Sequence, residues 1–123
     1  MSHRPRARRV LVVEDDYNSR ALMASVLSCA GYEVLTAPNG ALALELLREQ
    51  PADAILLDLD LPVLGGSEFA HAYRRLPRPH APIIVVSALS NAAAQAARIR
   101  ANEYLLKPFD LEELLRLVDR FTT

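Results

Sequence analysis

Four short apolar runs in this chain lead into polar residues that could act on a phosphoryl group and a metal ion. The residues at these run ends are Glu14 with Asp15, Asp58, Ser87 and Lys107. Carboxylates are hard ligands that suit magnesium, while hydroxyl and ammonium groups can stabilise the oxygens of a phosphoryl group in transfer. Lys107 is the only lysine in the chain, against thirteen arginines, and Pro108 follows it directly. If the four ends meet in space, they could support phosphoryl transfer to a carboxylate.

The elements that would position these residues alternate between short β-branched runs and longer helical stretches. Strands are predicted at residues 9–13, 33–36, 54–58, 83–87 and 103–106, and helices at 18–30, 39–48, 67–75, 91–100 and 110–121. Five strands, each followed by a helix, predict an α/β fold with one parallel sheet that helices cover on both faces. Right-handed crossovers favour the flavodoxin-like (βα)5 arrangement, in which the strand order is 2-1-3-4-5.

Helical spacing also predicts which side chains the first two helices bury. The expected buried residues are Leu22, Val26, Cys29 and Ala30 in the first helix and Leu42, Leu46 and Leu47 in the second. Cys29 is the only cysteine, so an intrachain disulfide is excluded. Asn39 is expected to cap the second helix, and Asp110 with Glu113 predicts a capping box at the start of the last one.

In a parallel sheet the carboxyl ends of all strands lie along one edge, so the four run ends should come together there. With strands about 4.8 Å apart, the four strands span roughly 14 Å, a width that side chains can bridge. Crowded carboxylates repel one another, and Mg²⁺ would relieve the repulsion. Asp58 lies in the middle of this edge and is the expected nucleophile, which would form an acyl phosphate. Lys107 and Ser87 would stabilise the transferred oxygens.

Five motifs, in this order, resemble the receiver domain of two-component response regulators, of the kind seen in chemotaxis regulators. They are Val12–Asp16, Leu57–Pro62 with Gly66, Val86–Ala88, Tyr104, and Lys107–Phe109. The resemblance covers about residues 7–121, nearly the whole chain. It implies that Asp58 is the phosphoacceptor and takes its phosphoryl group from a phosphohistidine. The donor would be a sensor histidine kinase or a histidine phosphotransfer protein.

The resemblance also implies a Mg²⁺ site. Asp15 and Asp58 would bind the ion through their carboxylates and Glu14 through water, and the backbone carbonyl of Asp60 would complete the protein's ligands. Asp16 is expected to be a flanking acid rather than a ligand. Because Asp60 adds a carboxylate next to the acceptor, we hypothesise that it alters metal affinity or the lifetime of the phosphoryl group. Dephosphorylation rates of the wild type and Asp60→Asn would test this hypothesis.

A conformational switch is the third implication of the resemblance. Ser87 would move toward the phosphoryl group and Tyr104 would turn inward behind it, which would reshape the face made by the fourth helix, fifth strand and fifth helix. That face is also a candidate homodimer interface. The Lys107–Pro108 bond is expected to be cis. Two departures from the family pattern concern the same region: Arg100 stands where glycine is usual, and the stretch 87–107 is short. We therefore expect the fourth helix, or the loop leading into it, to be shortened or displaced.

Length and composition set the remaining bounds. The 123 residues suit one domain, with residues 1–8 as a basic flexible leader and 9–123 as the receiver domain. The leader region and Arg9 carry four positive charges, and without them the net charge of −1 becomes −5 (−1 − 4). We expect no nucleic-acid binding from this domain, because no reading helix accompanies the basic segment. We also expect a cytoplasmic protein without membrane contact, since the sequence has neither a membrane span nor a signal peptide.

Two other functions stay open at this point. Asp58 and Asp60 after an apolar strand also resemble the start of a haloacid-dehalogenase-like phosphatase, although there the D-x-D strand comes first and the acidic pair last. The second alternative is a receiver-fold interaction module that is not phosphorylated. Individually, Asp15 or Asp16 could simply cap the first helix, Ser87 could cap the fourth, and Tyr104 could be packing on an edge strand.

Overall fold

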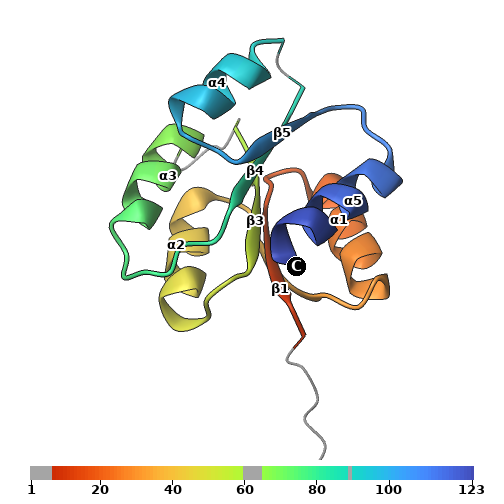
Figure 1. Cartoon of the computed structure of the whole chain (residues 1–123), viewed down its shortest axis with the longest axis horizontal. Helices are drawn as coiled ribbons and strands as arrows, with labels where there is room; N and C mark the ends of the chain where they lie inside the picture. Colours follow the sequence, from red (N-terminus) through yellow and green to blue (C-terminus); the bar gives the residue numbers. More distant parts are fainter. Residues whose placement is uncertain (1–6, 60–64, 89) are drawn as a thin grey trace, which may run out of the picture.

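The computed structural model describes residues 7–59, 65–88 and 90–123, and it shows one five-stranded parallel sheet in the order β2-β1-β3-β4-β5 (Figure 1). The strands are β1 Arg9–Val13, β2 Glu33–Ala37, β3 Ala54–Asp58, β4 Ile83–Ser87 and β5 Glu103–Leu106. The helices are α1 Tyr17–Cys29, α2 Gly40–Glu49, α3 Gly66–Arg74, α4 Ala92–Arg98 and α5 Leu111–Thr122. The predicted flavodoxin-like fold and strand order are confirmed. No helix in the described ranges is long and apolar enough to cross a membrane.

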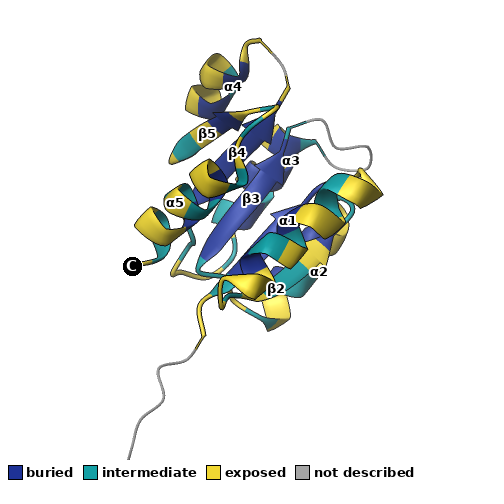
Figure 2. Cartoon of the chain, turned by 90° about the vertical axis from the view of Figure 1, so that its right-hand side faces the viewer, coloured by how far each residue is buried: buried dark blue, intermediate teal, exposed yellow. Residues whose placement is uncertain are grey.

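The sheet separates two apolar layers because side chains alternate along each strand. Val10 and Val12 of β1 belong to the cluster that α1 and α5 cover. Leu11 and Val13 belong to the cluster that α2, α3 and α4 cover. Every residue of β3 and β4 is buried, which explains their unbroken apolar runs. Figure 2 shows this buried sheet between helices whose outer faces are exposed.

Helix α1 buries a different face from the predicted one. Its buried residues are Met23 and Leu27, which pack on Val10 and Val12 of the sheet. Leu22 is 53% exposed, and Cys29 and Ala30 are exposed, so these three predictions are wrong. The docked face is rotated by one residue, about 100° around the helix. Cys29 therefore ends the helix in solvent.

Two helix starts test the predicted caps. The Asn39 side chain accepts a hydrogen bond from the Leu42 N–H at 2.9 Å, which confirms the cap of α2. Leu42 itself is 43% exposed, against prediction, while Leu47 is buried and Leu46 packs against the core. Asp110 occupies the cap position of α5, but its side chain makes no capping hydrogen bond. The predicted capping box is therefore wrong, and the first-turn acids of α5 favour the helix start only through its dipole.

Helix α4 has seven residues and is shorter than the helix predicted at residues 91–100. It ends in a left-handed turn at Arg100, whose φ is 58°. The Arg100 N–H donates to the Ala97 carbonyl at 3.1 Å, and the Ala101 N–H donates to the Ala96 carbonyl at 2.8 Å. The family's usual glycine at this position thus has a backbone reason, because only glycine adopts positive φ without a side-chain penalty.

Replacing Arg100 with glycine is expected to stabilise the fold by about 0.5–1 kcal/mol. The left-handed conformation destabilises the folded state by about 1–2 kcal/mol for an L-residue with a Cβ, and glycine avoids this cost. Glycine also gives the unfolded chain more conformational entropy, which offsets about 0.5–1 kcal/mol of the gain. Urea unfolding measures the difference. Arg100→Ala is the matched control, because it removes the same charge but keeps the Cβ. Equal midpoints for the two variants would contradict this explanation.

Candidate functional site

The polar ends of four strands converge at one edge of the sheet, as the sequence predicts. Glu14 follows β1, and its N–H donates to the Ala37 carbonyl at 3.0 Å. Asp58 ends β3 and pairs in register with Val86 of β4, so Ser87 lies one residue beyond that pair. Lys107 follows β5, and its N–H donates to the Ser87 carbonyl at 2.9 Å. Backbone hydrogen bonding therefore fixes where each of these side chains starts.

An acidic cluster forms the centre of this edge. Glu14, Asp15 and Asp58 each offer a carboxylate oxygen, and these three oxygens lie within 4.8 Å of one another. Glu14 is fully buried and Asp58 is 8% exposed, while Asp15 faces solvent. Oxygen ligands at this spacing, with one side open to water, suit a Mg²⁺ ion that keeps part of its hydration shell.

The lysine lies against this cluster, closer to Glu14 than to Asp58. The Lys107 Nζ is 2.6 Å from Glu14 Oε1 and 4.0 Å from Asp58 Oδ2. Burial lowers the pKa of Lys107, but the hydrogen bond to Glu14 and the charge of Asp58 outweigh it and raise the pKa above its ordinary value. The group is therefore a permanent cation. It bridges two of the three carboxylates.

One cation does not balance the cluster. Burial is the main reason that the pKa of Glu14 is raised from 4.5 to about 7. A hydrogen bond between protonated Glu14 and Asp58 also raises this pKa, while the ion pair with Lys107 lowers it. The buried Glu14 Oε2 has no hydrogen-bond partner in the described part of the chain. A buried oxygen without a donor, beside two further carboxylates, fits a bound cation or a water of its shell.

The remaining predicted residues take varied positions. Ser87 is buried at the end of β4, and Asn91 rather than Ser87 occupies the cap of α4. Tyr104 is 39% exposed on β5. Asp16 caps α1 by accepting from the Ser19 N–H at 2.8 Å, and this bond lowers the pKa of its carboxyl. The Lys107–Pro108 bond is cis, as expected. Asp60 lies outside the described residues.

Arg20 is a contributor that the sequence reasoning did not identify. Its Nη1 donates to the Glu14 carbonyl at 2.9 Å and to the Asp15 carbonyl at 3.3 Å. The available signal was its place in the first turns of α1, because helical side chains lean back over the preceding turn. Arg20 thus fixes the backbone that presents two of the three acids.

Fold and site together define a flavodoxin-like α/β domain with an acidic cluster, spaced so that it could hold a cation, at the carboxyl edge of its sheet. The sequence-family model of the response regulator receiver domain matches residues 10–119 of this chain. The chain therefore belongs to this family of two-component signalling domains. This assignment argues against the haloacid-dehalogenase-like phosphatase, because the receiver-domain match covers most of the chain.

Similar proteins include a transcriptional regulator and two solved receiver structures. The chain is 41% identical to the transcriptional regulatory protein PrrA of Mycobacterium tuberculosis over 112 residues, which cover 89% of this chain and 48% of PrrA. The receiver domain of sensor histidine kinase PA1611 from Pseudomonas aeruginosa, with a magnesium ion in its active site cleft, superposes with a TM-score of 0.87 at 31% identity, covering 95% and 98% of the two chains. The chemotaxis response regulator CheY4 of Vibrio cholerae superposes with a TM-score of 0.86 at 32% identity, covering 94% of this chain and 99% of CheY4. The chain spans about half the length of the curated relative.

Proposed function

We propose that this receiver domain takes a phosphoryl group onto Asp58 with the help of Mg²⁺, from the phosphohistidine of a sensor histidine kinase or a histidine phosphotransfer protein. The observation that carries the proposal is the position of Asp58, a nearly buried carboxylate within 4.8 Å of two other acids and 4.0 Å from the lysine. Glu14 is more deeply buried, but the ammonium group already occupies one of its oxygens at 2.6 Å.

The proposed transfer is a single displacement at phosphorus. A carboxylate oxygen of Asp58 attacks phosphorus while the bond from phosphorus to the imidazole nitrogen of the donor breaks, and the electron pair returns to the imidazole. Asp15 and Asp58 would hold Mg²⁺ directly, Glu14 through water, and Asp60 through its backbone carbonyl. The ion would neutralise charge on the phosphoryl oxygens. We count the domain as a signalling phosphoacceptor that catalyses only its own phosphorylation and dephosphorylation.

Lys107 and Ser87 complete the proposed site. Lys107 Nζ starts 4.0 Å from the Asp58 carboxylate, so a phosphoryl oxygen bound there would come within its reach. We infer that the ammonium then shares its charge between Glu14 and the phosphoryl group. The Ser87 hydroxyl, at the end of the neighbouring strand, would donate to another phosphoryl oxygen.

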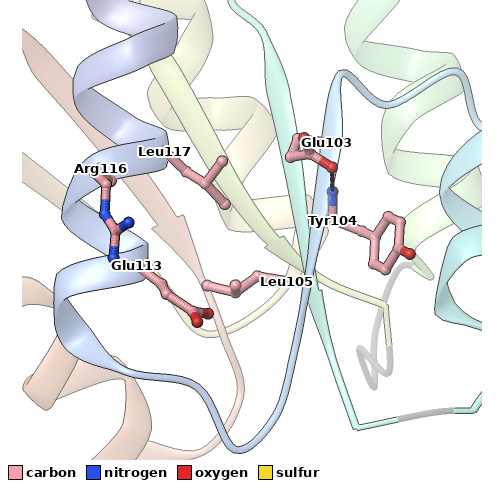
Figure 3. Close-up of a pocket in the computed structure, with 6 residues that line it drawn as sticks. All are labelled: Glu103, Tyr104, Leu105, Glu113, Arg116 and Leu117. Carbon is pink, nitrogen blue, oxygen red and sulfur yellow. Dashed lines mark hydrogen bonds between the residues drawn. The ribbon is translucent and has the colours of Figure 1, made fainter.

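The switch would act through Tyr104 and the face formed by α4, β5 and α5. A cavity of about 380 Å³ lies on this face, lined by Glu103, Tyr104, Leu105, Glu113, Arg116 and Leu117. Figure 3 shows Tyr104 pointing to the opposite side of β5 from Leu105. Tyr104 is 39% exposed, so it starts from an outward position, and the switch would turn it inward as Ser87 moves.

Phosphorylation is expected to shift the domain toward a homodimer through this face. The cavity on this face is lined by two glutamates and an arginine. A surface with both charges can pair with a second copy of itself about a two-fold axis. Sedimentation velocity before and after phosphorylation measures the change. Arg116→Glu should weaken the dimer, whereas Arg48→Glu, on α2, should not. A monomer in both states would contradict the dimer proposal without affecting Asp58.

Intact mass after incubation with acetyl phosphate and Mg²⁺ tests the phosphoacceptor function. One added phosphoryl group is expected, and none when the metal is chelated. An unchanged mass with Mg²⁺ present would favour the interaction module that is not phosphorylated. We further propose a cytoplasmic location, where such kinases present their phosphohistidines, and a basic leader at residues 1–8 ahead of the receiver domain at 9–123.

A further inference from the structure

A basic cavity lies between α3 and α4, and the acidic cluster contributes none of its lining residues. Its volume is about 260 Å³, and its polar lining consists of Ser67, His71, Arg74, Arg98 and Arg100. Ala70 and Ile99, both buried, are its apolar lining residues. In Figure 1 the two helices, green and cyan, lie next to each other on the face of the sheet away from α1 and α5.

The charged lining of this cavity is basic. Three arginines line it, and none of its lining residues in the described part of the chain is acidic. The acid of the first turn of α3, Glu68, lies against Gly65 instead. Within residues 7–59, 65–88 and 90–123, neither Arg98 nor Arg100 forms an ion pair. Three cations around one small space repel each other, and a bound anion would relieve that repulsion.

One of the three arginines is held in place by the backbone. Arg74 donates through Nη1 to the Ile99 carbonyl and through Nη2 to the Arg100 carbonyl, the latter at 2.7 Å. These bonds use two of the five N–H donors of the guanidinium group. They join α3 to the turn after α4 and fix the orientation of the fork, so little rotamer entropy remains to be lost when a ligand binds.

We propose that this cavity binds a phosphate group of a small anionic ligand. Planar guanidinium forks match phosphate oxygens in bidentate pairs, which is stronger than the attraction of a single point charge. The space is several times the roughly 30 Å³ share of one water molecule, so it admits a phosphate group together with the atoms attached to it. The Ser67 hydroxyl adds a neutral donor at one side.

The test is a titration of the ¹⁵N-labelled chain with inorganic pyrophosphate at constant ionic strength. EDTA and the Asp58→Asn background keep the ligand from the phosphoacceptor, so the result does not depend on the function of that site. Saturable shifts are expected at the amides of Ser67, His71 and residues 98–102. Shifts that stay linear, or that centre on Asp15 and Lys107, would overturn the proposal.

Arg98→Gln is expected to weaken binding about tenfold, the effect of losing one charge-assisted hydrogen bond. Arg48→Gln is the matched control, because Arg48 is also an exposed arginine in the last turn of a helix. It should change the affinity by less than about twofold, as expected for loss of distant charge alone. If both variants lost the same affinity for pyrophosphate, net charge alone would explain the effect, and the proposal would be overturned.

Arg100→Gly separates loss of binding from loss of folding. It should weaken pyrophosphate binding about tenfold, again by one charge-assisted hydrogen bond, while the fold becomes more stable. The Arg100 carbonyl, which accepts from Arg74, is kept. Unchanged affinity in Arg100→Gly would remove this arginine from the site and overturn the proposed three-arginine arrangement.

Discussion

Asp58→Asn is expected to abolish the incorporation of a phosphoryl group from acetyl phosphate. The amide oxygen carries no negative charge, so both the nucleophile and one of the three oxygens of the acidic cluster are weakened at once. Loss of at least about a hundredfold in rate is the expected scale for removing the reacting group. Intact mass over a time course with Mg²⁺ measures it.

Folding is not expected to limit this variant. Asp58 lies within the acidic cluster beside Glu14, so the substitution removes a like-charge repulsion and should leave the unfolding midpoint unchanged or raised. Asp110→Asn is the matched control, because Asp110 is exposed and its side chain makes no capping bond. A phosphoryl group found on Asp58→Asn would place the acceptor elsewhere, with Asp15 as the first residue to examine.

Magnesium affinity is expected to fall by at least about tenfold between pH 7.5 and pH 5.5. Glu14 has a pKa of about 7 in the folded, metal-free protein, so at the lower pH a proton must leave this group before it can serve the ion. Isothermal titration calorimetry at several pH values measures the affinity. Glu14→Gln should flatten the pH dependence, whereas Glu49→Gln, on α2, should leave it intact.

The same carboxyl sets the pH dependence of stability without metal. Its pKa is higher in the folded chain than the ordinary 4.5, so the folded state holds the proton more tightly between about pH 4.5 and pH 7. Stability therefore falls as pH rises through this window, by an amount on the order of 3 kcal/mol. The Lys107 pKa is raised above 10.5 and adds no slope here, because the ammonium stays charged throughout. Urea unfolding in EDTA would contradict this if stability rose toward pH 7.

The sequence predicted the strands well because their apolar runs are bounded by polar residues. The strands that begin at Arg9, Ala54, Ile83 and Glu103 have the predicted ends. The convergence of Glu14, Asp58, Ser87 and Lys107 followed from one rule, that parallel strands finish at a common edge. The resemblance to receiver domains was needed to choose Asp15 over Asp16 as the third acid of the cluster.

Helix rotation and side-chain pairing were less predictable. The first helix has apolar residues on more than one face, and only docking on the sheet selected Met23 and Leu27 over Leu22. The preference of Lys107 for Glu14 over Asp58 depends on distances of 2.6 and 4.0 Å, which no sequence spacing encodes. The basic cavity joins residues from positions 67–74 and 98–100, which meet only in the folded chain.

The exposed cysteine at the end of α1 has a practical consequence. The helix begins at the acidic edge, where Asp16 caps it, and its thirteen residues carry Cys29 about 20 Å away. A thiol-reactive fluorophore would attach at this single position and leave the phosphoacceptor untouched. The same thiol can also crosslink two molecules in air, so a covalent pair would imitate the phosphorylation-dependent dimer unless a reductant is present.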